Sequence, residues 1–390
     1  MAFSFLGVLM KIETLAVHAG QKPDKEFGAV VPPLYTTSTF AQSSPGEFAT
    51  YDYARAGNPT RSNFEMALAA LEGGTDAFAF ASGCAATSAV MHLVKSGEHV
   101  IAGDDMYGGS NRLFSKVMIH HGLEFDFVDL RDLNQLESAI KPNTKVIWLE
   151  TPTNPTLKLG DIAAISKMAK AKGILTVVDN TFASPIFQRP LELGADIVMH
   201  SATKYLGGHS DLITGALVVK DQELAEKIAF LSKSMGAIAS PFDCYMLSRS
   251  LKTLPVRMQR HQENAMEVAK FLESHAAVDK VIYPLLESHP QYQLAREQMS
   301  GFSGMMSMEV KGGLSGAKKV LENTQVFLLA ESLGGVESLI EHPAIMTHAS
   351  VPPDQREKLG IGDGFIRLSV GIEAISDLLE DLDQALKASH

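Results

Sequence analysis

The sequence predicts an α/β fold, with a mostly parallel sheet in a large first part and a smaller α+β part after it. Between about residues 61 and 220, short and nearly all-apolar segments alternate with helical segments. Such strands are typical of a parallel sheet that helices cover on both faces. After residue 273 the pattern changes to strands and helices without that alternation. A chain of 390 residues has room for both parts.

Apolar runs and helix ends place the elements of the large part. A Gly73-Gly74 pair ends the first expected helix, and Asp161 is a suitable cap for a later one. The expected helices span residues 61–72, 85–95, 133–140 and 161–172. The expected strands span residues 76–81, 99–102, 124–128, 145–150, 174–178, 196–199 and 215–219.

The second part follows helical sequence that extends to about residue 273, and we expect the linker near residues 250–259. Its expected elements are strand 278–283, an apolar stretch 304–310, helix 314–323, strand 365–369 and helix 375–388. The predicted division is an N-terminal arm at 1–60, an α/β domain at 61–255 and a C-terminal α+β domain at 256–390.

The start of the chain has no core of its own. Residues 12–60 are polar and irregular, with turn-forming residues at 31–33 and 55–59. We expect this segment to wrap over its own domain or over a neighbouring subunit. Residues 1–10 are apolar but are not a signal peptide, because the first charge, Lys11, follows the run. We expect them to be a disordered or peripheral extension.

The overall charge and the cysteines exclude several classes of function. A net charge of −11 argues against binding of nucleic acid or of an anionic membrane, because both require a basic surface. The only cysteines, Cys84 and Cys244, fit a reducing compartment and predict a cytoplasmic protein. The sequence has no CxxC or HExxH motif, so we expect no metal site.

Polar groups follow three of the expected strands, at the edge where an open α/β sheet binds its ligands. Ser82-Gly83-Cys84 opens a helix whose first N–H groups suit an anion. Asp179 follows one strand, and Ser201-Ala202-Thr203-Lys204 follows the next. Taken singly these features are weak, because glycine turns, capping aspartates and surface lysines are common.

Together, these groups are the parts that a pyridoxal-phosphate (PLP) site requires. Such a site needs a lysine that binds the cofactor, an aspartate for the ring nitrogen and a cup for the phosphate. A lysine in a dry pocket also loses its proton more easily and becomes a nucleophile. The combination on one edge of one sheet therefore predicts a PLP site.

Longer motifs are specific enough to compare with known proteins. They are Y-A-R-A-G-N-P-T-R at 53–61, D-D-M-Y-G-G at 104–109, E-T-P-T-N-P at 150–155, V-D-N-T-F at 178–182, S-A-T-K at 201–204, A-E-S-L-G-G at 330–335 and I-R-L-S-V-G at 366–371. With these motifs the chain, from about Glu13 to its C-terminus, resembles the Cys/Met-metabolism PLP-dependent enzymes. The resemblance implies the α/β fold of PLP-dependent transferases, the aspartate aminotransferase-like fold type I.

The resemblance implies a role for each matching residue around the cofactor. Lys204 binds PLP and moves protons, and Asp179 pairs with the ring nitrogen. Tyr107 stacks on the pyridine and acts as acid or base at the leaving group. The residues implied for the phosphate are Gly83, Cys84, Ser201 and Thr203, with Tyr53 and Arg55 from the neighbouring subunit. Such sharing implies a homotetramer built as a dimer of dimers.

At the substrate end, the resemblance implies that Arg367 binds the α-carboxylate, with Asn154 and Ser332 nearby. A planar guanidinium suits that task. The residues implied for a second amino-acid head are Asp52, Arg112 and Glu331. Within the family this pattern is most like the cystathionine gamma-lyases. It implies a carbon–sulfur lyase that cleaves L-cystathionine by γ-elimination to cysteine, 2-oxobutanoate and ammonia, with release of hydrogen sulfide from cysteine or homocysteine as a further activity.

Four other functions stay open. Gamma-synthases share the residues for the second head, so γ-replacement on O-succinylhomoserine is the main alternative. Methionine gamma-lyases usually carry a cysteine shortly after the stacking tyrosine, and this chain has none at 108–112. Beta-lyases usually lack an acid at the position of Glu331. A PLP-binding protein without catalysis is least favoured, because Lys204 and Tyr107 are both present.

Overall fold

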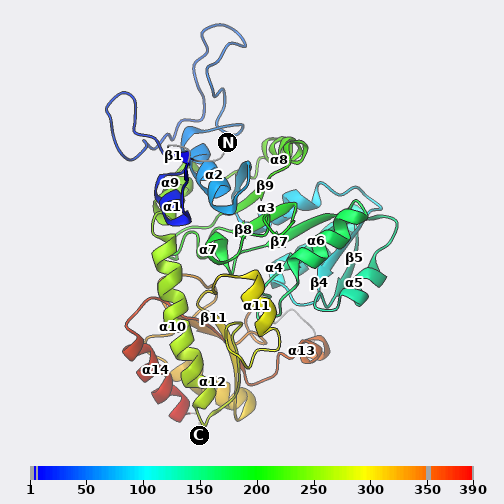
Figure 1. The fold of residues 1–390 in the computed structure, drawn as a ribbon, viewed down its shortest axis with the longest axis vertical. Coiled ribbons are helices and arrows are strands. Elements are labelled where there is room, and N and C mark those ends of the chain that lie inside the picture. The colour runs from blue at the N-terminus through cyan, green and yellow to red at the C-terminus, as the bar shows by residue number, and fades with distance from the viewer. Residues whose placement is uncertain (1–3, 6–7, 348–352, 389–390) are drawn as a thin grey trace.

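Two β-sheets organise the chain, which the computed structural model describes over residues 4–5, 8–347 and 353–388 (Figure 1). The larger sheet has seven strands in the order β3-β9-β8-β7-β6-β4-β5. They are β3 (Asp76–Phe80), β4 (His99–Gly103), β5 (Glu124–Val128), β6 (Thr144–Glu150), β7 (Leu175–Asp179), β8 (Ile197–Ser201) and β9 (Gly215–Val219). Of the seven strands, β9 alone runs in the opposite direction to the others, which confirms the mostly parallel sheet.

Helices cover both faces of the larger sheet because successive apolar residues of a strand point to opposite faces. On β6, Val146 and Trp148 pack with helices α3, α4 and α8, whereas Ile147 and Leu149 pack with α5 and α6. The helices of this part are α2 (Pro59–Glu72), α3 (Gly83–Met91), α4 (Gly108–Lys116), the 3-10 turn η1 (Met118–His121), α5 (Leu133–Ala139), α6 (Ile162–Ala171), α7 (Ser184–Phe187), α8 (Gln222–Met235) and α9 (Pro241–Leu251).

The smaller sheet has five strands in the order β10-β11-β14-β13-β12. They are β10 (Val278–Ile282), β11 (Met305–Val310), β12 (Leu328–Leu329), β13 (Leu339–Glu341) and β14 (Phe365–Ser369). The helices around it are α11 (Tyr292–Gln298), α12 (Gly313–Asn323), α13 (Pro353–Leu359) and α14 (Ile375–Lys387). This second, smaller mixed layer confirms the predicted α+β part.

The long helix α10 (Leu254–Ser274) connects the two layers. It contacts α9 at its start and β10, β11 and α14 of the smaller layer, and Figure 1 shows it running along one side of the molecule. The helix begins within the linker predicted at 250–259. The domain boundary at 255–256 itself stays a prediction.

Two regions differ from the sequence-based expectation. Residues 12–18 form helix α1 (Ile12–His18) instead of irregular chain, because Ile12, Leu15 and Ala16 pack on the main core. In the predicted extension, β1 (Ser4–Phe5) and β2 (Val8–Leu9) form a short antiparallel pair, and residues 1–3 and 6–7 lie outside the described residues.

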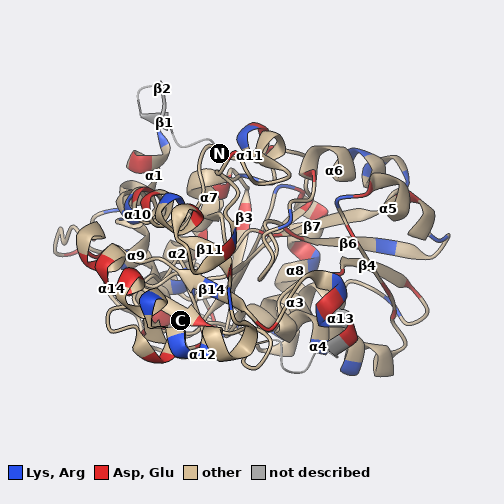
Figure 2. Ribbon diagram, turned by 90° about the horizontal axis from the view of Figure 1, so that it is seen from below, with Lys and Arg blue, Asp and Glu red and all other residues tan. Residues whose placement is uncertain are grey.

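The surface mixes charges of both signs. Acidic and basic residues are interspersed along outer helices such as α10 and α13 (Figure 2). Within the described part of the chain, no helix is long and apolar enough to cross a membrane. The same residues hold no group of three or more His, Cys, Asp or Glu side chains that could bind a metal ion.

Candidate active site

A cavity of about 300 Å³ opens where the carboxyl ends of the large sheet meet the small layer. The predicted site residues in its wall are Gly83, Cys84, Tyr107, Asn154, Asp179, Ser201, Thr203, Lys204, Glu331, Ser332 and Arg367. The predicted residues outside its wall are Asp52, Tyr53, Arg55 and Arg112. One chain therefore brings together most of the predicted site, from segments far apart in sequence.

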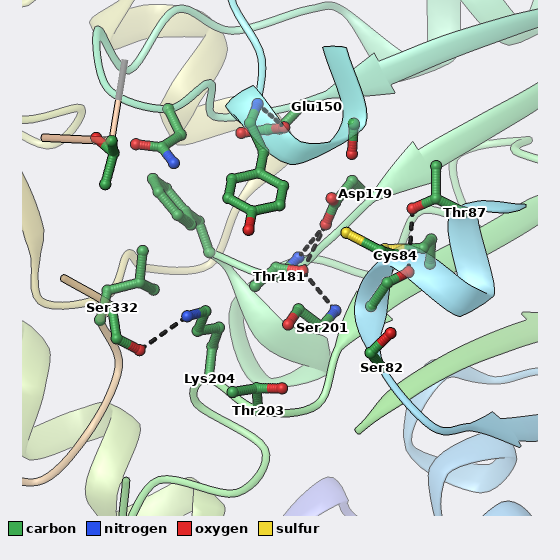
Figure 3. Close-up of a pocket in the computed structure, with 18 of the residues that line it drawn as sticks. Ser82, Cys84, Thr87, Glu150, Asp179, Thr181, Ser201, Thr203, Lys204 and Ser332 are labelled. Carbon is green, nitrogen blue, oxygen red and sulfur yellow. Dashed lines mark hydrogen bonds between the residues drawn. The ribbon is translucent and has the colours of Figure 1, made fainter. Parts of the chain in front are cut away.

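Asp179 ends β7 and lines the cavity (Figure 3). Thr181 donates twice to its Oδ1, from the backbone N–H at 3.0 Å and from the hydroxyl at 2.5 Å. Burial raises the pKa of Asp179, and the Thr181 bonds and the nearby His200 act in the opposite direction. No described residue donates a hydrogen bond to Oδ2, which leaves that oxygen available to a cation.

Glu150 lies beside Asp179, because β6 and β7 pair the two residues in register. Its Oε2 accepts the backbone N–H of Tyr107 at 2.8 Å, just before α4 (Figure 3). Burial and then the Asp179 carboxylate raise the pKa of Glu150 well above its usual value. Sequence reasoning did not assign Glu150 to the site, although it begins the E-T-P-T-N-P motif.

The turn after β3 forms an anion cup at the start of α3. Ser82 Oγ accepts the N–H of Ala85 at 3.1 Å, as an N-cap residue does. The N–H groups of Gly83 and Cys84 belong to the first turn and have no partner inside the helix. A Cβ added at Gly83 would lie 3.0 Å from Ser201 Cβ, so Ser201 would have to shift to accept a side chain there.

Lys204 reaches the cavity from the loop after β8. Its Nζ donates to Ser332 Oγ at 2.8 Å and so joins the two layers (Figure 3). Burial and the charge of Arg367 lower the pKa of Lys204 to about 8, which frees part of the amine for nucleophilic attack near neutral pH. The preceding Thr203 is held by the bond from its hydroxyl to the Thr214 carbonyl at 3.2 Å.

Arg367, on β14, forms the wall that comes from the small sheet. Its guanidinium donates to Asn154 Oδ1 at 3.0 Å and to the Ser332 carbonyl at 2.7 Å. It also pairs with Glu341 Oε1 at 2.9 Å. The predicted carboxylate-binding group is thus assembled. Sequence reasoning missed Glu341, which lies on a strand of three residues with no recognisable motif.

Two further charged residues lie close to the cavity without a protein partner. Glu331 lines the wall beside Ser332 and forms no hydrogen bond or ion pair with the described residues. Arg112 is exposed on α4, and its charge lowers the pKa of Cys84 and of Tyr107, in both cases against the larger effect of burial. Both charges are therefore available to a ligand.

The residues of the N-terminal arm lie away from the cavity of their own chain. Tyr53 is 47 % exposed, and the Arg55 guanidinium carbon lies 5.5 Å from the centre of its ring. Arg55 also donates to the Lys233 carbonyl at 2.5 Å, and Asp52 accepts the N–H of Tyr53 at 2.7 Å. Figure 1 shows the arm extending as long loops from the large layer.

The wall of the cavity fits PLP. The α3 cup suits the phosphate, the available Asp179 Oδ2 suits the protonated ring nitrogen, and the Lys204 amine suits the aldehyde. Tyr107 is 43 % exposed and lines the space between these groups, so its ring has room for a flat partner.

Comparisons with known proteins agree with this chemistry. The family model described as Cys/Met metabolism PLP-dependent enzyme matches residues 13–387. A cystathionine beta-lyase from Coxiella burnetii is 58 % identical over 96 % of this chain and 97 % of its own length. A cystathionine gamma-lyase from Dictyostelium discoideum is 53 % identical over 96 % and 97 %.

A solved structure gives the same answer for the fold. The crystal structure of cystathionine gamma-lyase from Lactobacillus plantarum, complexed with L-serine, superposes with a TM-score of 0.95 at 49 % identity. The match covers 97 % of this chain and 99 % of that one. This chain therefore belongs to the family of Cys/Met-metabolism PLP-dependent enzymes, and pyridoxal phosphate is its cofactor.

Proposed function

We propose that the enzyme cleaves L-cystathionine by γ-elimination, with cysteine, 2-oxobutanoate and ammonia as products. The observation that carries this proposal is the Glu331 carboxylate, which lies in the cavity wall without a hydrogen bond or ion pair to the described residues. Cystathionine has a second amino-acid head, and its ammonium group suits such an anion. Arg112 and Asp52 are the further residues that we assign to this head.

We assign the cofactor contacts as follows. Asp179 pairs with the ring nitrogen of PLP, and Tyr107 stacks on the ring. The residues for the phosphate are Gly83, Cys84, Ser201 and Thr203, with Tyr53 and Arg55 of a second copy of the chain. Pyridoxal phosphate, when bound, withdraws electrons from the substrate carbons next to the amino group.

The protein's own groups then bind the substrate and move its protons. Arg367, with Asn154 and Ser332, holds the α-carboxylate and so fixes which face of Cα is turned to Lys204. The Lys204 amine removes the Cα proton, a step that its lowered pKa favours near neutral pH. After passing that proton on to the cofactor, the same amine would remove a Cβ proton, whose electron pair forms the Cβ–Cγ double bond as the Cγ–S bond breaks. The Tyr107 hydroxyl supplies a proton to the sulfur that leaves Cγ, so that cysteine departs as a neutral thiol.

A second candidate is β-elimination of cystathionine to homocysteine, pyruvate and ammonia. The specific observation in its favour is the 58 % identity to a relative named as a beta-lyase. Both reactions use the same carboxylate site, so they differ in which carbon–sulfur bond is broken.

One assay separates these activities. The purified enzyme is given L-cystathionine, and 2-oxobutanoate and pyruvate are measured separately. We expect 2-oxobutanoate to predominate, and the Lys204→Ala variant to form neither. Pyruvate as the main product would contradict γ-elimination. Faster formation of cystathionine from O-succinylhomoserine and cysteine than its cleavage would instead indicate a gamma-synthase.

We also propose that the enzyme works in the cytoplasm as a homotetramer built as a dimer of dimers. The support is the arm, which exposes apolar side chains such as Phe27, Val30 and Tyr53 that a second copy would cover. The two cysteines are free thiols, as a reducing compartment favours.

A further inference from the structure

A buried carboxylate stands directly behind the arginine of the proposed substrate site. Glu341 and Arg367 are paired neighbours on β13 and β14, and both side chains are almost fully buried. Glu341 Oε1 accepts from Arg367 Nη1 at 2.9 Å and from the Thr347 hydroxyl at 2.9 Å. Its other oxygen, Oε2, is buried and has no hydrogen-bond partner among the described residues.

This pair is unexpected for a site that binds an anion. An arginine attracts a substrate carboxylate most strongly when no other anion neutralises it. In this site the Glu341 carboxylate contacts Arg367, and both groups are buried. Removing each of these charges from water is energetically costly. A role in packing alone does not require a charged side chain at Glu341.

The charge of Glu341 also reaches the amine of Lys204. Arg367 donates to the Ser332 carbonyl, and Lys204 donates to the Ser332 hydroxyl, so one residue connects both cations. Apart from the dominant effect of burial, the pKa of Lys204 is lowered by Arg367 and raised by Glu341, Glu331 and Cys84. The charged groups that face Glu341 are Arg367, Glu331 and Lys204.

We propose that Glu341 is a positioning residue, an inference that rests on the proposed role of Arg367. The negative charge of Glu341 weakens the binding of α-carboxylates by Arg367 and keeps a larger fraction of Lys204 protonated. Both effects have the same cause, an anion beside the arginine. Weak binding of the α-carboxylate would speed release of 2-oxobutanoate, the product that keeps this carboxylate.

Glu341→Gln tests this with little change of shape. The amide oxygen can keep the two bonds of Oε1, and the amide nitrogen takes the position of Oε2, which has no bond to lose. Glu341→Asp keeps the charge on a shorter side chain. Glu337→Gln makes the same chemical change at an exposed residue outside the cavity wall and is the matched control.

Two ligands that differ only in the carboxylate report on Arg367. L-Alanine and ethylamine are titrated against the PLP-loaded enzyme, and binding is followed by the visible absorbance of the cofactor. In Glu341→Gln we expect L-alanine to bind about tenfold more tightly, because Arg367 loses its neutralising anion. A change in interaction free energy equivalent to one pK unit alters a binding constant about tenfold. Ethylamine binding should stay within about twofold of wild type, and Glu337→Gln should change neither ligand.

A second readout needs no substrate. The absorbance of the lysine-bound cofactor is titrated with pH, and its midpoint should fall in Glu341→Gln, because a lost anion destabilises the protonated nitrogen. Glu341→Asp should restore the wild-type midpoint. Equal shifts in both variants, or unchanged or weaker L-alanine binding in Glu341→Gln, would overturn the inference. If wild-type enzyme binds L-alanine no better than ethylamine, the proposed role of Arg367 fails instead.

Discussion

The cavity wall and the N-terminal arm both carry family motifs, yet only the residues of the cavity wall meet around one cavity within a single chain. Asp179 ends β7, Lys204 lies in the loop after β8 and Arg367 lies on β14, and each makes hydrogen bonds within the chain. Tyr53 and Arg55 are exposed and are not part of the cavity wall. Strands fix a side chain because their neighbours fix the backbone, whereas an arm without a core needs another surface.

The difference teaches which roles one chain can perform alone. In the proposed assignment, a single chain positions the groups for the ring nitrogen, the aldehyde and the α-carboxylate. The arm residues would obtain their proposed role only when a second copy presents its cavity to them. Each prediction below tests one side of this comparison, in order of decreasing effect.

Lys204→Ala should have the largest effect, because it removes the amine that we assign to cofactor binding and proton transfer. We expect the rate of cystathionine cleavage to fall by at least about four powers of ten, as loss of a nucleophile and base typically causes. The yellow absorbance of the lysine-bound cofactor should disappear, while circular dichroism stays as in wild type. A variant that turns over at wild-type rates would refute the assignment.

Arg55→Ala should weaken PLP binding about ten- to a hundredfold, the range for one charge-assisted hydrogen bond. Because we propose that Arg55 acts on a neighbouring subunit, mixing this variant with Lys204→Ala should restore part of the activity. Some mixed sites then hold an intact lysine and an intact arm. If subunits are shown to exchange and every mixture stays inactive, the arm does not act in trans.

Glu331→Ala should lower kcat/KM for cystathionine by about one to two powers of ten, since a charge-assisted contact contributes roughly 1.5–3 kcal/mol. Substrates without the second head, such as homocysteine, should lose little. The comparison of these two substrates is the measurement. Equal losses on both would mean that Glu331 only braces its loop.

The pH dependence of Lys204 should distinguish it from a surface lysine. In enzyme freed of cofactor, the rate at which added PLP binds covalently should rise about tenfold per pH unit and level off above about pH 8, the pKa that burial and Arg367 impose. The unfolded chain still holds this proton up to its normal pKa of 10.5, so the same group should make the folded state more stable as pH rises from about 8 to 10.5. A rate that still rises at pH 10 would contradict a buried, lowered pKa.

Removal of residues 1–9 should have the smallest effect. The family match begins at residue 13, and we expect unfolding free energy to change by less than about 0.5 kcal/mol, as for peripheral surface changes. Thermal unfolding and gel filtration against the full chain measure this. A loss of oligomer would show that the extension packs on another subunit.

The sequence predicted the strands of the large sheet well, because each is a short apolar run between clear turns. It also placed Asp179 and Lys204 at strand ends, and the structure brings both residues to the cavity wall. It could not predict Glu150 or Glu341, because their role depends on which strands are neighbours. Strand register brings Glu150 beside Asp179 and Glu341 beside Arg367, and neither pairing leaves a local signal.

Helix α1 was missed for a related reason. Its seven residues are too few for a clear period, and they are helical because Ala16 and its neighbours find the core formed by distant helices. Helix α4, after Tyr107, begins with two glycines, which are poor helix formers, so its sequence gave no helical signal.

The order of the chain has a consequence for synthesis on the ribosome. The large sheet is complete once β9 emerges, since β9 bridges β3 and β8, whereas Arg367 comes near the very end. Domains generally fold as units in the order in which they are made. The ribosome therefore makes the cup, Asp179 and Lys204 well before it makes the Arg367 end of the site.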